Sequence, residues 1–352
     1  MENLNNHEKN ILRDDQEKVL VNSWDVTIKN ADGEAERHTN YQYNYPIKSD
    51  LESIQARETE IKFRRRKVGN QACKTLAIFG DAHIGYRQIG NELVPTHDEK
   101  ALTVAKEIIY DVSPNIIVNL GDHLDLAILG RYDPDSNQFA NTLQASIDRG
   151  HEYMGELRGV ARDARILELQ GNHDARIKRT LAKRAVQLMG LKQAGTDRED
   201  IFSYEHLMNY NPIGVEYVSG YPAGEIIYSD DLHIKHGSDL RSNGSTAELL
   251  SKKYPYHGVI QGHGHKMQLH QKTLPDGRVF NYYMNPILGK TTGEIPGYGT
   301  AIDDHDKVVE KQEDWQQGIT IVEDYGDGHY NFMPINIIDG VAYFQGKKYE
   351  AR

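Results

Sequence analysis

Five short blocks of this chain carry side chains of the kinds that bind metal ions. They read Asp81-Ala82-His83, Gly121-Asp122-His123-Leu124-Asp125, Gly171-Asn172-His173-Asp174, His236-Gly237 and Gly262-His263-Gly264-His265. Their carboxylate, imidazole and amide groups form a ligand set that suits borderline and hard divalent cations. One such block arises easily by chance, whereas five in one chain predict a hydrolytic centre with two metal ions.

The elements that precede the blocks must bring them together. Each block follows an apolar run that is typical of a buried strand, at 76–79, 116–118, 166–167, 232–234 and 259–260. Helices are predicted between the first strands, over 97–111, 138–162 and 174–190. This alternation predicts a mostly parallel sheet with helices on its faces. Because sites in such sheets lie beyond the carboxyl ends of the strands, we expect the blocks to meet in one place.

The remainder of the chain divides into an appendage, a core and a C-terminal region. Residues 1–70 predict a helix over Glu8–Val21, a hairpin over 25–29 and 39–45, and a charged helix over Leu51–Arg66. The core spans 71–290 and becomes strand-rich after residue 212. The C-terminal region, 291–352, holds most of a loop or lid predicted over 288–315 and then strands that pack on the core. Turns are predicted at Asp327-Gly328 and Asp339-Gly340.

Composition narrows the classes of protein to consider. The chain has 352 residues, 38% hydrophobic and 26% charged, which is ordinary for a globular protein. No apolar run reaches the length of a membrane helix, and the start is polar, so we expect a cytoplasmic protein that does not enter membranes. The single cysteine, Cys73, excludes an intrachain disulfide.

The charge distribution bears on the partner. A formal net charge of −11 argues against tight non-specific binding of nucleic acid, although bound cations would neutralise part of it near the site. One basic cluster, at 62–67, is typical of a solvated linker. A second cluster follows the third metal block and either faces phosphate or forms a solvated helix face; it consists of Arg176, Lys178, Arg179, Lys183 and Arg184.

The five blocks, in this order, resemble the motifs of the calcineurin-like metallophosphoesterase superfamily over roughly Leu76 to Gly289. The resemblance implies an α/β fold in which a two-sheet β-sandwich is flanked by helices, with the N-terminal appendage added. It implies two divalent metal ions, with Mn²⁺ expected first and iron, zinc or nickel as alternatives. One ion would be bound by Asp81, His83, Asp122 and His265. The other would be bound by Asp122, Asn172, His236 and His263, so that Asp122 bridges the two.

The same resemblance implies that His173 protonates the leaving oxygen and that Asp125 orients His173. Elementary chemistry agrees, because a histidine beside two metal ions suits proton transfer to a leaving group. An aspartate that accepts the other ring proton fixes the tautomer of the imidazole. A neutral ligand such as Asn172 leaves the cations electrophilic, and two cations together lower the pKa of a bridging water to give hydroxide.

Neighbouring residues bear on the substrate. We expect Tyr86, Arg87, Arg176 and His123 to contact it, although a packing role for His123 is an equal alternative. Protein phosphatases of the superfamily usually have an arginine directly after the second-block aspartate, whereas Leu126-Ala127 follow Asp125 here. They also usually end the third block with glutamate, where this chain has Asp174. A protein phosphatase is therefore disfavoured.

The first block and the residues after it, Asp81 to Gln88, are similar to the opening motif of recombination-repair exonucleases. The expected activity is therefore that of a phosphodiesterase that uses a metal-bridging hydroxide on nucleic acid, DNA or RNA, or on nucleotides. A phosphomonoesterase that acts on protein or on small molecules is the alternative. A non-catalytic scaffold with this fold is less expected, because all the ligands are present. The appendage is a candidate interface for a homo-oligomer.

Overall fold

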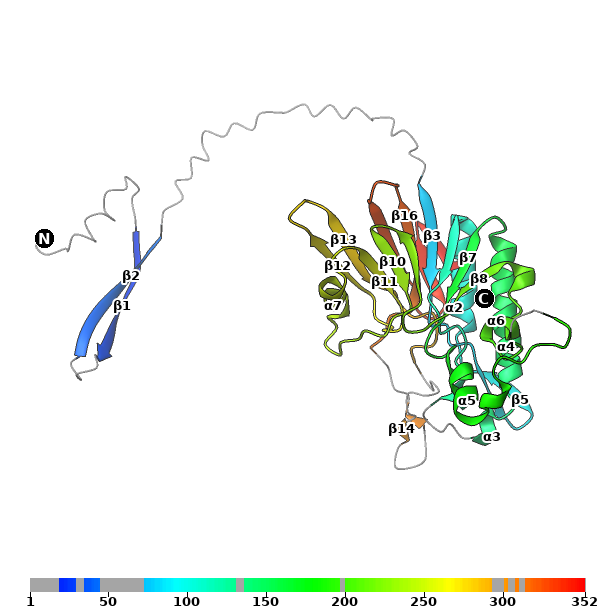
Figure 1. Cartoon of the computed structure of the whole chain (residues 1–352). Coiled ribbons are helices and arrows are strands. Elements are labelled where there is room, and N and C mark those ends of the chain that lie inside the picture. Colours follow the sequence, from blue (N-terminus) through cyan, green and yellow to red (C-terminus); the bar gives the residue numbers. More distant parts are fainter. Residues whose placement is uncertain are drawn as a thin grey trace, which may run out of the picture. The chain divides into compact units, whose positions relative to one another are not determined.

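The computed structural model describes residues 19–29, 35–44, 73–130, 136–196, 200–292, 301–302, 308–309 and 314–351 (Figure 1). Contacts divide the chain into two units, Met1–Val68 and Gly69–Arg352. In the first unit, β1 (Val19–Lys29) pairs antiparallel with β2 (Ala35–Asn44). The predicted hairpin is confirmed, with longer strands than expected.

The predicted helix over Glu8–Val21 is wrong at residues 19–21, which lie in β1. The strand forms because its backbone pairs with β2, a partner distant in sequence that local propensity does not reveal. The rest of that helix and the helix predicted over Leu51–Arg66 lie outside the described residues.

The second unit contains two large sheets. The first has the order β17-β16-β3-β6-β7-β8, and its central strands are β3 (Lys74–Phe79), β6 (Ile116–Asn119) and β7 (Arg165–Leu169). These three strands and β8 (Val215–Val218) are parallel. The other two strands, β16 (Gly318–Asp324) and β17 (Tyr330–Asn336), run antiparallel and extend the sheet beyond β3. The C-terminal region thus contributes strands to the sheet itself.

The second sheet has the order β12-β13-β11-β10-β9. Its strands are β9 (Glu225–Ser229), β10 (Leu232–Lys235), β11 (Gly258–Gln261), β12 (Gln268–Thr273) and β13 (Val279–Met284). The three middle strands are parallel, and both edge strands run antiparallel to their neighbours. The two strand ranges predicted before the last two blocks, 232–234 and 259–260, are therefore confirmed to within one residue.

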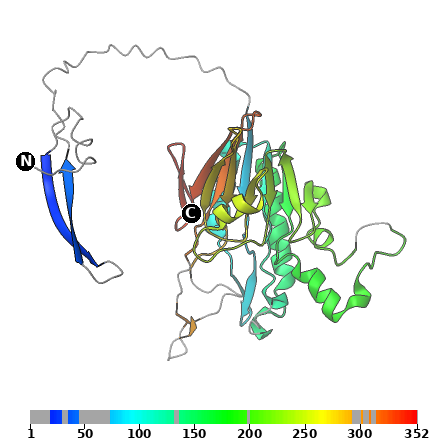
Figure 2. The same ribbon diagram turned by 60° about the vertical axis from the view of Figure 1, so that its left-hand side comes forward.

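The two sheets pack face to face through alternating side chains. Leu76 and Ile78 of β3 contact a layer that includes Ile234 of β10 and Tyr283 of β13. Ala77 and the other alternate residues of β3 face the opposite way, toward the helices. Those helices are α2 (Glu99–Val112) and α4 (Leu143–Val160), seen against one face of the six-stranded sheet in Figures 1 and 2. Helix α7 (Thr246–Lys253) covers β11 and β13.

The predicted architecture, a two-sheet sandwich flanked by helices, is confirmed. Helix α5 (Arg176–Arg184) is shorter than the predicted 174–190, because Ala185 takes an extended φ of −153° and a 3₁₀ turn follows at Val186–Leu188. The hairpin β4 (Tyr86–Ile89) and β5 (Glu92–Pro95) was not predicted. Shorter elements are α3 (Ser136–Phe139), α6 (Tyr204–Leu207), and 3₁₀ turns at Ala127–Leu129 and Asn211–Ile213.

The C-terminal region differs from prediction in one turn. The turn at Asp327-Gly328 joins β16 to β17 as expected. The last strand pair, β18 (Val341–Phe344) and β19 (Lys347–Glu350), turns at Gln345-Gly346. The predicted turn at Asp339-Gly340 instead closes a tight bridge between Ile338 and Val341. In the range predicted as a lid, β14 (Ala301–Ile302) pairs with β15 (Val308–Val309), and most of the remainder lies outside the described residues. Among the described helices, none is long and apolar enough to cross a membrane.

A carboxylate is buried inside the six-stranded sheet. Glu168 of β7 is fully buried, and its Oε2 atom accepts hydrogen bonds from the hydroxyl of Tyr210 (2.6 Å) and the amide of Asn119 (3.1 Å). Burial raises the pKa of Glu168 from 4.5 to about 7. The folded chain therefore retains a proton that the unfolded chain releases, and the stability of the fold falls as pH rises from about 4.5 to about 7.

Replacing Glu168 by glutamine is expected to remove this loss of stability. Glu168→Gln should match the wild type at pH 4 and exceed its free energy of unfolding at pH 8 by roughly 3 kcal/mol. Urea unfolding of the metal-free chain at both pH values measures the difference. Glu107→Gln, a change at an exposed position on α2, is the control. An unchanged pH dependence in Glu168→Gln would show that Glu168 is not the group responsible.

Candidate metal centre

The carboxyl ends of β3, β6 and β7 lie side by side, so the first three blocks meet directly after them. Backbone hydrogen bonds join the loops: the N–H of Asp81 donates to the carbonyl of Gly121 (2.9 Å), and the N–H of His83 donates to that of Asp122 (3.0 Å). The loop after β11 joins from the second sheet, since the N–H of His263 donates to Asp81 Oδ2 (3.1 Å). The expected single site at the strand ends is therefore formed.

The ligand residues form two groups. In the first, ligand atoms of Asp81, His83 and His265 lie within 4.8 Å of one another. In the second, the same holds for Asp122, His236 and His263. The seventh residue joins this second group, because Asn172 Oδ1 lies 3.1 Å from His236 Nε2. The two groups correspond to the two ligand sets that the family resemblance implies, except that Asp122, implied for both sets, lies with the second group only.

The first group offers the ligand atoms that a divalent cation requires. His83 Nε2 lies 3.4 Å from His265 Nε2, and the latter lies 3.3 Å from Asp81 Oδ1. All three side chains are buried. Two imidazole nitrogens and one carboxylate oxygen that converge away from water form a donor set for a transition-metal ion. The residues present therefore fit a metal ion.

The backbone of the ligands is strained. Five of the seven ligand residues have a left-handed conformation, with φ between 47° and 63°: Asp81, His83, Asp122, His263 and His265. This conformation costs a residue other than glycine roughly 1–3 kcal/mol, so it persists only where the surrounding structure enforces it. Such strain gathers at functional sites, and here it turns successive ligands toward common centres.

The protonation states of the ligands favour metal binding. Burial, followed by the nearby charge of His173, lowers the pKa of His83 to about 3. Burial and the charge of His236 lower the pKa of His263 to about 4. Both rings are thus neutral at pH 7, the form that binds a metal ion. Burial alone would raise the pKa of Asp122, but the surrounding histidines outweigh it and lower the pKa, so the carboxylate is ionised.

Contacts outside the ligands fix their orientation. The Nδ1–H of His236 donates to the carbonyl of Leu120 (2.9 Å), which leaves Nε2 directed toward Asp122 Oδ2 at 3.5 Å. Asp174 is a residue whose role the sequence did not reveal. Its Oδ2 atom accepts from the backbone N–H groups of Asp122 and Gly171, both at 2.8 Å, and so ties the second block to the third. Its position directly after His173, within the third block, was the feature of the sequence that could have indicated a role in the site.

A buried histidine and aspartate lie beside the first group. His173 Nδ1 is 2.7 Å from the backbone oxygen of Asp125 and 3.1 Å from its Oδ1 atom. The His173 ring centroid is 4.4 Å from that of His83, and His173 Nε2 is 3.9 Å from Asp122 Oδ2. Although burial lowers the pKa of His173, the charges of Asp122 and Asp125 outweigh it and raise the pKa. The pair implied by the resemblance therefore lies together, with Nε2 toward the ligands.

The close approach of the second and third blocks requires glycine. A Cβ atom on Gly171 would lie 2.1 Å from Asp122 Oδ1 and 2.3 Å from the Asp122 nitrogen. We expect Gly171→Ala to displace Asp122, to reduce bound metal and to destabilise the fold by about 1–3 kcal/mol. Elemental analysis and thermal unfolding test this. Gly159→Ala on α4 is the matched control, because nothing lies within 4 Å of its added methyl group. A full metal content in Gly171→Ala would contradict the expectation.

The four expected substrate contacts have different surroundings. His123 is fully buried, its Nε2 atom is 3.0 Å from the carbonyl of Gly150, and its ring stacks near Tyr153. Because the imidazole is buried against α4, its surroundings favour the packing alternative over a contact with substrate. Tyr86 and Arg87 lie half-buried on β4. Arg176 extends from α5 to the pair of His173 and Asp125.

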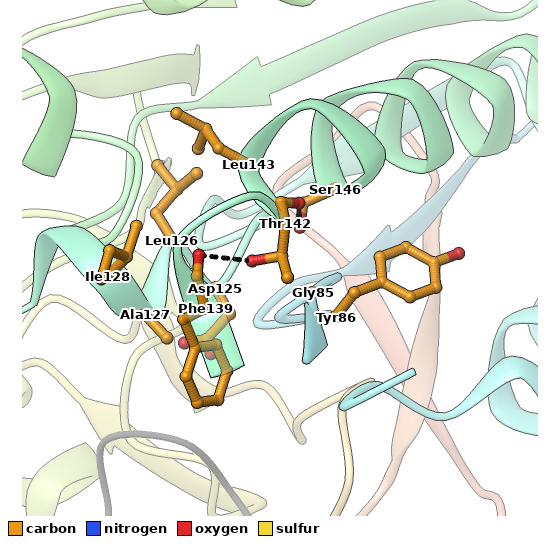
Figure 3. A pocket seen from close by; sticks show the side chains of 10 residues that line it. All are labelled: Gly85, Tyr86, Asp125, Leu126, Ala127, Ile128, Phe139, Thr142, Leu143 and Ser146. Atoms are coloured by element: carbon orange, nitrogen blue, oxygen red, sulfur yellow. Dashed lines mark hydrogen bonds between the residues drawn. The ribbon is translucent and has the colours of Figure 1, made fainter. Parts of the chain in front are cut away.

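A small pocket adjoins Asp125 (Figure 3). Tyr86, Leu126, Phe139 and Leu143 supply most of its apolar wall, and Asp125 is the charged residue among those lining it. The hydroxyl of Thr142 donates to the carbonyl of Phe139 (3.0 Å) and closes one side. Asp125, which contacts His173, therefore borders a pocket with mostly apolar walls.

Two further contacts support the loops of the first group. His97 Nδ1 lies 2.9 Å from the carbonyl oxygen of Gly85, and its Nε2 lies 2.7 Å from Glu99 Oε1. Arg149 donates from Nε and Nη2 to the two carboxylate oxygens of Glu99, each at 2.8 Å, a contact that the sequence did not predict. Trp315 packs edge-on against His265, with ring centroids 4.4 Å apart.

Comparison with known proteins gives distant likenesses. No family model and no curated protein matches the chain. Among solved structures, the phosphoesterase Yfce from E. coli is 10% identical, with a TM-score of 0.31, over 74% of this chain and 98% of that one. A dimetal phosphatase from Danio rerio is 11% identical, with a TM-score of 0.35, over 74% and 95%. A purple acid phosphatase from yellow lupin is 11% identical, with a TM-score of 0.36, over 91% and 58%. Similarity at this level identifies no activity for this chain.

Proposed function

We propose that this chain is a metal-dependent phosphoesterase of the calcineurin-like metallophosphoesterase superfamily. One observation carries the proposal: two buried groups of metal ligands lie beside a buried pair of His173 and Asp125. A site that only bound metal ions would have no need for a non-ligand histidine held in this way. The motifs and their order support the same conclusion.

Each residue has a role in this proposal. Asp81, His83 and His265 would hold one ion, and Asn172, His236 and His263 would hold the other, with Asp122 contributing to both. Two divalent cations, Mn²⁺ first, would polarise a phosphoryl group and lower the pKa of a water molecule. His173 gives the proton on Nε2 to the leaving oxygen as the bond to phosphorus breaks. Asp125 holds the opposite ring nitrogen and so keeps the imidazole oriented.

We further propose that the substrate is a phosphodiester of nucleic acid. Helix α5 carries five basic residues and no acidic one, and four of the five are exposed: Lys178, Arg179, Lys183 and Arg184. The guanidinium of Arg179 lies 5.3 Å from the ring centroid of Tyr221, and that ring lies 5.6 Å from the ring of His236. Cationic and aromatic side chains thus extend outward from the second group, an arrangement that suits a phosphate backbone and stacked bases.

Hydrolysis assays test the proposal at two levels. After metal removal by chelation, the chain should hydrolyse neither bis-(4-nitrophenyl) phosphate nor 4-nitrophenyl phosphate, and added Mn²⁺ should restore cleavage of the diester above all. Absence of both bound metal and hydrolysis with Mn²⁺ would support a non-catalytic scaffold. A preference for the monoester would refute the nucleic-acid proposal and favour a phosphomonoesterase.

Charge removal on α5 should separate binding of nucleic acid from chemistry. The triple variant Lys178→Gln, Lys183→Gln, Arg184→Gln should bind single-stranded oligonucleotides more weakly and flatten the slope of log K against log salt by about one per lost phosphate contact. Its turnover of bis-(4-nitrophenyl) phosphate should change little. Fluorescence anisotropy at several salt concentrations measures the slope. An unchanged slope would indicate that the cluster is a solvated helix face.

A further inference from the structure

The loop after Asp125 receives an arginine from elsewhere in the chain. No arginine follows Asp125 in the second block, where Leu126 and Ala127 stand. The side chain of Arg176 reaches this loop from α5 instead. Its Nη1 atom donates to the carbonyl oxygens of Asp125 (2.7 Å) and Leu126 (3.3 Å), and the side chain is only 17% exposed.

The other end of the same guanidinium lies at the acid. Arg176 Nη2 donates to His173 Nε2 (2.9 Å), so without substrate this nitrogen is an acceptor and the ring proton lies on Nδ1, toward Asp125. Any oxygen that comes within hydrogen-bond distance of His173 Nε2 therefore comes within reach of the guanidinium as well. A guanidinium presents several N–H groups in one plane, so it can keep its contacts to the carbonyl oxygens while it donates to a phosphate oxygen.

We propose that Arg176 binds the substrate beside His173, on the leaving-group side of the phosphorus, and supplies from α5 the guanidinium that the second block lacks. The inference rests on the proposed phosphoesterase function. When the guanidinium turns from His173 Nε2 to the substrate, that nitrogen takes up a proton from solvent. A water-derived hydroxide then forms the new bond to phosphorus, the bond to the leaving oxygen breaks, and the proton passes from His173 Nε2 to that oxygen. Arg176 stays protonated and stabilises, by hydrogen bonding, the negative charge that develops on that oxygen.

A purely structural role is the competing explanation. The bonds from Nη1 could serve only to hold the loop of Asp125, and the guanidinium also packs 3.5 Å from where a Cβ atom on Gly130 would lie. Loss of a structural contact would slow every substrate alike. Loss of a contact to the leaving oxygen would slow most strongly those substrates whose leaving groups are poor.

Hydrolysis of aryl methyl phosphates whose phenols differ in pKa separates these roles. With Mn²⁺ present, Arg176→Gln should lower kcat about 100-fold for the phenol ester and only a few-fold for the 4-nitrophenol ester. Arg176→Lys should fall between the wild type and Arg176→Gln. The control is Arg165→Gln, an exposed arginine paired with Glu216 at the opposite end of β7, which should match the wild type throughout.

Binding of inorganic phosphate gives a second measurement that does not depend on turnover. By calorimetry on the Mn²⁺-loaded chain, Arg176→Gln should bind phosphate about 10-fold more weakly than Arg165→Gln. Equal losses of kcat across the ester series, with unchanged phosphate binding, would overturn the role of Arg176. If Arg176→Gln does not fold, the same comparison in Arg176→Lys decides. Failure of the wild type to cleave any ester would instead refute the phosphoesterase function.

Discussion

Replacing Asp122 by asparagine is expected to abolish hydrolysis and to release at least one metal ion. Asp122 belongs to the second ligand group, and its carboxylate also acts electrostatically on His83 of the first. A shared carboxylate supplies the negative charge that allows two cations to lie close together. Removing residues that merely orient ligands costs about 10- to 100-fold, so loss of this ligand should cost more.

Elemental analysis and diester hydrolysis measure the two effects of Asp122→Asn. Asp163→Asn is the matched control, because it makes the same chemical change at an exposed position after α4. Thermal unfolding of the metal-free chains shows whether the fold survives, since Asp122 Oδ1 also accepts from the N–H of His173 (2.7 Å). Two bound ions per chain together with normal turnover would refute the bridging role of Asp122.

His173→Asn should give the opposite combination, with both metal ions retained and most turnover lost. His173 is in neither of the two proposed ligand sets, so the variant should keep the metal content of the wild type. Loss of a general acid typically lowers the rate by about 100- to 10,000-fold. The loss should be smallest for esters of acidic phenols, whose leaving oxygen needs no proton. Full activity toward an alkyl ester would exclude His173 as the acid.

The contrast between these two variants is more informative than either alone. Asp122→Asn changes metal content and rate together, whereas His173→Asn changes the rate alone. If both variants lost metal, His173 would act as a ligand. The comparison is needed because possible ligand atoms of His173, His83 and Asp125 lie within 4.8 Å of one another, so His173 is placed where it could also bind a metal ion.

Much of the site was predictable because the elements that carry it have recognisable local sequence patterns. Buried strands such as β6 and β11 read as short apolar runs, and the polar blocks follow at once. Glycines such as Gly171 indicated close approach of the loops, which the structure shows against Asp122. The parallel pairing of β3, β6 and β7 followed from the general rules for alternating strands and helices.

What escaped prediction depends on partners distant in sequence. The direction of His123 is decided by the carbonyl of Gly150 on α4, and nothing within the second block signals it. Arg149 donates to the carboxylate of Glu99, and Arg176 donates to the backbone carbonyl of Asp125, each across about fifty positions of sequence. The hairpin of β4 and β5 is short and half-exposed, so its apolar pattern was too weak to recognise.

The pairing of β16 with β3 has a consequence for how the chain matures. The strand that leads into Asp81 and His83 has β6 on one side and β16 on the other, and β16 comes from residues 318–324. During synthesis, β3 therefore presents an unpaired edge to solvent until the ribosome has released those residues. Contacts so distant in sequence form slowly. The first ligand group should consequently gain its full affinity for metal late, after release, and nascent chains stalled before residue 318 should associate through that edge.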